Sequence, residues 1–91
     1  MRIRWTPASA DDLEGIADYL ALHFPSFRQS TLHAIWNAIA SLSSMPHRGR
    51  VGWEEGTREL VVAGLPYIVI YRIKADAVEI LRIYHGAQDR G

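Results

Sequence analysis

The stretch TRELVVAGLPYIVIYRIKADAVEILRIY, residues 57–84, contains three apolar runs separated by two short turns. The turns are Gly64-Leu65-Pro66 and Ala75-Asp76-Ala77, and the runs at 57–63, 67–74 and 78–84 are rich in Val, Ile, Leu and Tyr. Short β-prone runs joined by tight turns are typical of neighbouring antiparallel strands. This part of the chain therefore predicts a three-stranded antiparallel meander.

The segment before the meander predicts one short strand and two helices. Residues 2–5 alternate polar and apolar side chains, as in a strand that ends at Thr6-Pro7. Two series of apolar residues at helical spacing follow, the first capped by Thr6 or Ser9 and the second by Ser26. The short link around Pro25 predicts an antiparallel helical hairpin. The positions expected to face the core are Leu13, Ile16, Ala17, Leu20 and Phe24, then Leu32, Ile35, Ile39 and Leu42.

The predicted fold is a single α+β domain over residues 1–91, with the order β-α-α-β-β-β. Both helices are amphipathic, so we expect them to cover one face of an antiparallel sheet, which the first strand joins after the hairpin. Strict alternation along the last strand places Val78, Ile80, Arg82 and Tyr84 on one face, and Leu81 and Ile83 on the other. We expect the row with Arg82 to lie on the open face, and residues 85–91 to form an aperiodic tail.

Composition excludes several classes of protein. Ten Lys and Arg residues balance ten Asp and Glu residues, so no general affinity for nucleic acid or anionic membranes is expected. The chain has no cysteine and no glycine-rich phosphate motif or HExxH metal motif, which predicts no metal and no cofactor. The N-terminus lacks the apolar region of a signal peptide, and no apolar run reaches the roughly 20 residues that span a bilayer. These features favour a cytoplasmic location.

The loop at residues 46–56 is the first candidate site. It is polar and glycine-rich, with Arg48 and Arg50 flanking a glycine and Trp53 as its one large apolar side chain. Two arginines here indicate either contact with an acidic partner or a solvated loop. The strand that follows carries Arg58 in line with an apolar row, so its guanidinium either reaches a partner at the sheet edge or forms an ion pair. The acidic candidates for that pair are Glu54, Glu55 and Glu79.

The end of the last strand is the second candidate site. Arg82, Tyr84 and His85 lie within four residues of one another. In a ribonuclease, such a histidine would transfer protons and such an arginine would stabilise the phosphorane. The alternative is a strand end whose polar side chains meet solvent or a partner chain, and the absence of an evident second general base favours this alternative.

Taken in order, the motifs of this chain resemble the ParE branch of the RelE/ParE superfamily, the toxins of bacterial type II toxin–antitoxin modules. The resemblance covers about 85 residues, and it includes the order of the predicted elements. The motifs that carry it are Trp5-Thr6-Pro7-Ala8, Asp12-Leu13, Tyr19-Leu20, Gly49-Arg50, Gly56-Thr57-Arg58-Glu59-Leu60-Val61-Val62, Pro66-Tyr67-Ile68-Val69, Tyr71-Arg72-Ile73, Ile80-Leu81-Arg82-Ile83 and His85-Gly86-Ala87-Gln88.

The resemblance implies a toxin held inactive by direct binding of a cognate antitoxin. RelE-like members cleave mRNA in the ribosomal A site, whereas ParE-like members poison DNA gyrase without that activity. Glu59, Val61 and Ile68 stand where RelE-like nucleases carry cations on the sheet, which favours a ParE-like toxin with gyrase as its target. The alternatives are a ribosome-dependent mRNA endonuclease that uses Arg58, Arg82 and His85, and a degenerate toxin that only binds its antitoxin. The short tail suggests the degenerate toxin.

The resemblance also implies where a partner binds. An antitoxin segment that is disordered alone is expected to fold on the open sheet face and the helical hairpin. Neither a membrane nor a specific DNA or RNA sequence is expected as a partner. The candidate partner-binding residues are Arg48, Arg50, Trp53, Arg58, Tyr71, Arg82, Tyr84 and His85, and Trp36 and Tyr67 are further aromatic candidates.

Overall fold

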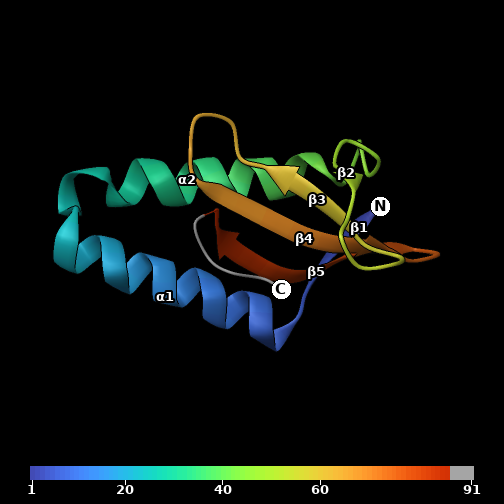
Figure 1. The fold of residues 1–91 in the computed structure, drawn as a ribbon, viewed down its shortest axis with the longest axis horizontal. Helices are drawn as coiled ribbons and strands as arrows, with labels where there is room; N and C mark the ends of the chain where they lie inside the picture. Colours follow the sequence, from blue (N-terminus) through green and yellow to red (C-terminus); the bar gives the residue numbers. More distant parts are fainter. Residues whose placement is uncertain (87–91) are drawn as a thin grey trace.

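The computed structural model describes residues 1–86 and consists of a helical hairpin packed on a five-stranded sheet (Figure 1). This confirms the predicted α+β class. The two-residue strand β2 was not predicted, and residues 87–91 of the expected tail lie outside the described residues. The elements are β1 (Arg2–Trp5), α1 (Pro7–His23), α2 (Pro25–Ser41), β2 (Arg50–Val51), β3 (Arg58–Val61), β4 (Tyr67–Ile73) and β5 (Ala77–His85).

The strand order in the sheet is β1-β5-β4-β3-β2. The meander is antiparallel as predicted, but β1 joins β5 in parallel, so the sheet is mixed. The pairing of β1 with β5 begins at Arg2 opposite Ala77 and stops at Trp5 opposite Ile80. Beyond Ile80, the remaining half of β5 is therefore an edge of the sheet, and this edge faces the start of α1.

Both helices begin with proline at their first turn. Thr6 caps α1 by accepting a hydrogen bond from the Ser9 N–H at 3.2 Å, and this decides between the two predicted caps. The predicted cap of the second helix at Ser26 is wrong, because α2 already begins at Pro25. Phe24 caps the end of α1 and the start of α2. Figure 1 shows the two helices antiparallel, with the closed end of the hairpin projecting beyond the end of the sheet where β4 begins.

The core lies between α2 and the helix-facing side of the sheet. Ile35 and Ile39 of α2 and Leu42, which caps this helix, are buried there, as predicted from their spacing. From α1, Leu20 is buried and Leu13 and Ile16 are partly buried. Phe24 is half exposed, because the hairpin turns there beyond the sheet. The predicted core residues Ala17 and Leu32 are only partly buried and line a hollow between the two helices.

A β-bulge in β5 changes which side chains share a face. Ile70 pairs with Arg82 and Tyr71 pairs with Ile80, so Leu81 is an extra residue in the ladder. The predicted single row of Val78, Ile80, Arg82 and Tyr84 is therefore wrong. Val78, Ile80 and Ile83 are buried toward the helices, whereas Arg82 is exposed on the open side, where it was expected.

The loop that precedes β2 is fixed to the core by Tyr71. This tyrosine is fully buried, and its hydroxyl donates to the Pro46 carbonyl at 2.7 Å and accepts from the Gly49 N–H at 2.8 Å. A Cβ on Gly49 would lie 2.7 Å from both this hydroxyl and the Glu59 carbonyl. Only glycine therefore fits at this position without a shift of the loop.

We predict that Tyr71→Phe lowers the free energy of unfolding by about 1–3 kcal/mol, because it leaves the Gly49 N–H and the Pro46 carbonyl without their shared partner. Urea denaturation followed by circular dichroism measures this change. Tyr19→Phe is the control, since the Tyr19 ring is half exposed and water can replace its hydroxyl contacts. An equal effect of the two substitutions would contradict the structural role of the Tyr71 hydroxyl.

Candidate functional site

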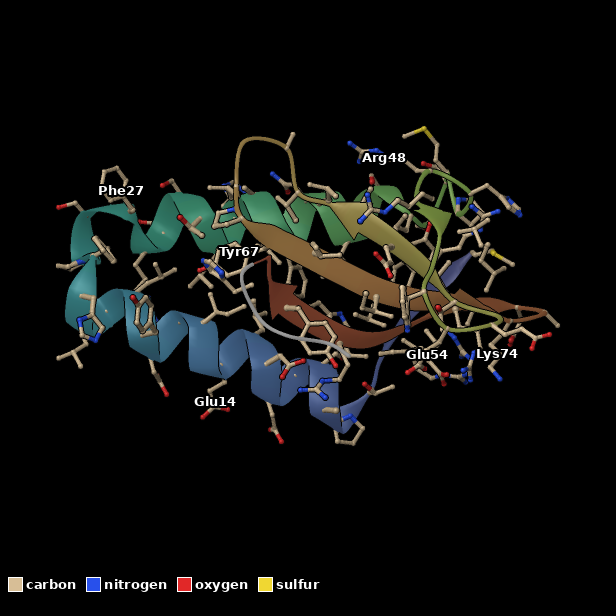
Figure 2. The ribbon with its side chains drawn as sticks, viewed as in Figure 1. Glu14, Phe27, Arg48, Glu54, Tyr67 and Lys74 are labelled. Carbon is tan, nitrogen blue, oxygen red and sulfur yellow. The ribbon has the colours of Figure 1, made fainter. Side chains whose placement is uncertain are left out.

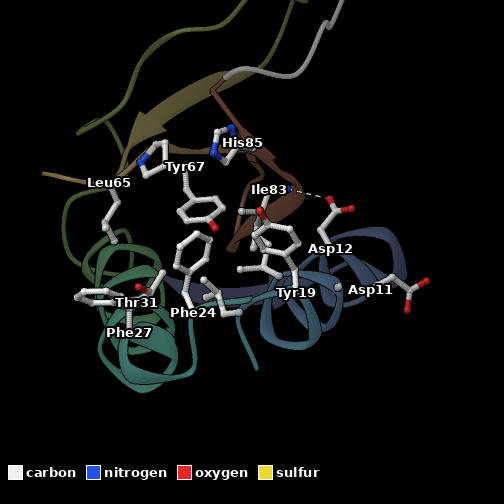
Figure 3. A pocket seen from close by; sticks show the side chains of 14 residues that line it. Asp11, Asp12, Tyr19, Phe24, Phe27, Thr31, Leu65, Tyr67, Ile83 and His85 are labelled. Atoms are coloured by element: carbon white, nitrogen blue, oxygen red, sulfur yellow. Dashed lines mark hydrogen bonds between the residues drawn. The ribbon is translucent and has the colours of Figure 1, made fainter. Parts of the chain in front are cut away.

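A groove lies between the closed end of the helical hairpin and the nearby end of the sheet (Figure 3). Its cavity measures about 680 Å³, and its walls come from α1, the start of α2, the β3–β4 turn and the end of β5. The floor is apolar, with Ile16, Leu20, Tyr67 and Ile83. A cavity of this size and polarity is suited to apolar side chains of a partner.

Aromatic side chains line the groove and remain open to solvent. Tyr19 is 53% exposed, Phe24 50% and Phe27 62%. Figure 3 shows the Phe24 ring facing Tyr67, whose own burial raises the pKa of its phenol. His85 packs edge-on against Tyr67, with ring centroids 5.5 Å apart. A contiguous exposed aromatic patch of this kind is typical of a surface where a partner protein binds.

Asp12 closes the exposed edge of β5 beside this groove. Its Oδ2 accepts from the Ile83 N–H at 2.9 Å (Figure 3). The same oxygen accepts from Arg82 Nε at 2.8 Å, while Oδ1 accepts from Arg82 Nη2 at 3.1 Å. The hydrogen bond from Arg82 to Asp12 raises the pKa of the guanidinium further above its ordinary value. One carboxylate thus holds α1 against β5 and occupies a backbone donor that an edge strand would otherwise present.

The opposite face of the sheet carries a smaller cavity of about 270 Å³. Arg82 lies over the Tyr84 ring, 4.9 Å from its centroid, at one wall of this cavity. At another wall, the buried carboxylate of Glu59 accepts from Arg50 Nη2 at 3.1 Å and from the Trp53 N–H at 3.0 Å. The Trp53 side chain itself is 82% exposed.

The arginines of the first candidate site contact their own chain. Arg58 is half-buried and donates to the Gly49 carbonyl at 2.6 Å, so the expected ion pair with a glutamate is wrong. Arg48 is exposed and donates to Ser41 Oγ at 2.6 Å. Together with the pair of Arg50 and Glu59, these contacts fix the loop between α2 and β3.

Two aromatic candidates have structural contacts in the free chain. Tyr71 is fully buried, so it cannot touch a partner while the core keeps its packing. Trp36 is half exposed and stacks on Trp5, with ring centroids 5.5 Å apart. Neither tryptophan lines the groove.

The three residues of the nuclease alternative do not come together. His85 pairs with Tyr67 and Arg58 with Tyr71, four residues along β4, so they stand about 13 Å apart along the sheet. Arg82 pairs with Ile70 and faces the open side, whereas His85 shares the helix-facing side with Tyr67. No single phosphate can meet all three side chains in this arrangement.

The sequence interpretation missed Tyr19, Phe27 and Asp12 as residues of a surface. Tyr19, Phe24 and Phe27 flank Pro25, and together they supply more aromatic area than one buried helical stripe requires. That surplus at the hairpin turn is the signal in the sequence that points to the groove. Asp12 belongs to one of the motifs that carry the resemblance, but its contacts with β5 could not be predicted, because its partners lie 70 and 71 positions away.

Within residues 1–86, no helix combines the length and the apolar character that crossing a bilayer requires. In the same part of the chain, no three His, Asp or Glu side chains are gathered closely enough to hold a metal ion.

Comparisons with known proteins identify ParE-type and RelE-type toxins as relatives. Residues 3–90 match the family described as the ParE toxin of the type II toxin–antitoxin system parDE. A protein of Sinorhizobium fredii named as the toxin Y4kP is 40% identical over 87 residues, which cover 96% of this chain and 90% of the relative. The toxin RelE2 of Caulobacter vibrioides is 34% identical over 87 residues, or 96% of this chain and 97% of the relative.

A solved structure, the chromosomal ParDE toxin–antitoxin system from P. aeruginosa, has the same fold. It superposes with a TM-score of 0.82 at 28% identity, and the match covers 93% of this chain and 95% of that one.

We predict that Asp12→Ala lowers the free energy of unfolding by about 1–2 kcal/mol, because it removes three hydrogen bonds to β5, two of them from a partly exposed arginine. Thermal or urea unfolding measures the change, and Asp11→Ala, which alters the neighbouring exposed carboxylate, is the matched control. Equal stability of the Asp12 variant and the wild-type chain would show that the bridge to β5 contributes nothing.

Proposed function

The chain belongs to the ParE toxin family of type II toxin–antitoxin systems, and from this premise we propose that it inhibits DNA gyrase in the cytoplasm and is neutralised by direct binding of a cognate antitoxin. The match to the ParE family over residues 3–90 is the observation that carries the proposal. Such a toxin acts by binding its target protein and needs no catalytic group of its own.

The separation of Arg58, Arg82 and His85 supports this choice over an mRNA endonuclease. Cleavage of a phosphodiester requires a proton-transferring group and a cation within hydrogen-bond reach of the same phosphate. His85 lies in the groove on the helix-facing side, and both Arg58 and Arg82 are held by other contacts. The endonuclease remains the second candidate, because RelE2 is among the relatives.

The groove is the surface that best fits the antitoxin. It combines an apolar floor with three exposed aromatic side chains, whereas the cavity on the open face is smaller and mixes apolar side chains with the charged Glu54, Glu59 and Arg82. Exposed aromatics in a concave site supply most of the binding energy in protein interfaces. We therefore assign the antitoxin to the groove beside the helical hairpin, which is one part of the surface expected from the resemblance, and not to the open sheet face, which is the other part.

For the target, we predict that the purified toxin inhibits supercoiling of relaxed plasmid by DNA gyrase. The double variant Arg82→Gln with His85→Asn should inhibit gyrase to the same extent, because no catalytic step depends on these residues. Circular dichroism confirms that the double variant is folded. Normal supercoiling at a large molar excess of folded toxin would refute the gyrase proposal.

A separate experiment tests the alternative that the chain is an mRNA endonuclease. Primer extension on mRNA from a cell-free translation reaction would reveal cleavage in the A-site codon. Such cleavage by the wild-type toxin, lost in the double variant, would establish the nuclease in place of gyrase inhibition.

For the antitoxin, we predict that Tyr19→Ser combined with Phe24→Ser weakens binding by at least about tenfold, the effect of losing an interfacial residue worth more than 1 kcal/mol. Binding is measured by calorimetry with the antitoxin that neutralises the wild-type toxin in cells. Trp53→Ser is the matched control, since it removes an exposed aromatic side chain at the other end of the molecule. Loss of binding with Trp53→Ser alone would place the antitoxin on the open face.

A further inference from the structure

We propose that the turn at residues 52–57 binds gyrase, with the Trp53 ring in an apolar socket of the target and Glu54 and Glu55 paired with Lys or Arg beside that socket. This inference rests on the proposed function, because it takes gyrase as the target. It adds the surface of the toxin that touches the target and the chemistry of the surface that receives it.

Trp53 is presented to solvent almost completely. Among the large hydrophobic side chains of residues 1–86 it has the largest exposed fraction, 82%. The residue also lines the 270 Å³ cavity on the open face, so a partner that covers its ring can enter a hollow beside it. Tryptophan supplies more binding energy at protein interfaces than almost any other residue, because its large ring is desolvated by the partner. Its position here therefore marks a contact surface.

Hydrogen bonds fix the turn that carries this ring. The Gly52 N–H donates to the Thr57 carbonyl at 2.8 Å, and the Thr57 N–H donates to the Glu54 carbonyl at 3.2 Å. The Thr57 hydroxyl donates to the same Glu54 carbonyl at 2.6 Å, and the buried Glu59 carboxylate accepts from the Trp53 N–H at 3.0 Å. A turn that is already ordered loses less conformational entropy when a partner binds it.

The charge beside Trp53 indicates the kind of partner. Glu54 and Glu55 are exposed and form no ion pair within residues 1–86, whereas Arg50, just before the turn, is already paired with Glu59. Carboxylates repel the phosphates of nucleic acid and attract Lys and Arg. A protein that holds DNA carries such cations along the path of the duplex. Gyrase acts on DNA and therefore offers the basic surface that this turn requires.

The turn lies apart from the surface assigned to the antitoxin. Figure 2 shows Glu54 at the opposite end of the molecule from Phe27, which lines the groove. No residue of the turn lines the groove. A substitution in the turn can therefore remove binding to the target and leave binding to the antitoxin intact.

The variant Trp53→Ser tests the proposal in the gyrase supercoiling assay. We expect half-inhibition to require at least about ten times more of this variant than of the wild-type toxin, the effect of losing a central interface residue. Calorimetry should show unchanged affinity for the antitoxin that neutralises the wild-type toxin. Leu22→Ser is the matched control, because Leu22 is 77% exposed and lies at the end of α1, far along the chain from the turn. It should inhibit gyrase as the wild-type toxin does.

A pair of charge reversals tests the chemistry of the partner independently of Trp53. Glu54→Lys with Glu55→Lys should need about ten times more toxin for half-inhibition at low ionic strength than Glu14→Lys with Asp18→Lys. Both double variants have the same net charge, so any general attraction to DNA affects them equally. Added salt should narrow the difference, because it screens exposed charges.

Several results would overturn the proposal. Equal inhibition by Trp53→Ser and the wild-type toxin, or equal inhibition by the two charge reversals, would remove the turn as the contact and leave gyrase as the target. Loss of antitoxin affinity together with inhibition in Trp53→Ser would show a structural role. A wild-type dimer that Trp53→Ser dissociates without loss of inhibition would assign the turn to a second copy of the chain. If the wild-type toxin itself does not inhibit gyrase, the proposed target fails as well, so the two failures are distinguishable.

Discussion

The early end of the pairing between β1 and β5 is the constraint on which this structure depends. Because the chain leaves the sheet at Thr6 to begin α1, the second half of β5 lacks a neighbouring strand. Asp12 supplies the missing partner by bonding to the Ile83 N–H and to Arg82. That bridge fixes the angle at which α1 leaves the sheet, and the space between them becomes the groove.

The fold was largely predictable from the sequence because its signals are local. The spacing of Ile35, Ile39 and Leu42 and the turns at Gly64 and Asp76 each act within a few residues. The faces of β5 were not predictable beyond Ile80, because period-two alternation assumes an unbroken ladder and Leu81 interrupts it. The short strand β2 was missed because two residues carry no periodicity.

The candidate site was harder to predict, because its residues come together through tertiary structure alone. Phe24 has the spacing of a core residue, yet the hairpin carries it past the end of the sheet and leaves it half exposed. The arginines of the loop at residues 46–56 have the composition of an anion site, yet they bond to Gly49, Ser41 and Glu59 of their own chain. The acidic residues at the start of α1 are visible in the sequence, but only the fold revealed that one of them, Asp12, binds the edge of β5.

Pairing of the first strand with the last has a consequence for the timing of synthesis. Arg4 lies beside Glu79, 75 positions later. At ribosomal rates of 5–20 residues per second, β1 waits roughly 4–15 s for its neighbour to be made. The pairing of β1 with β5, the Asp12 bridge and the groove therefore form only near the end of translation. A nascent chain interrupted before β5 can pair β2, β3 and β4 but lacks these three features.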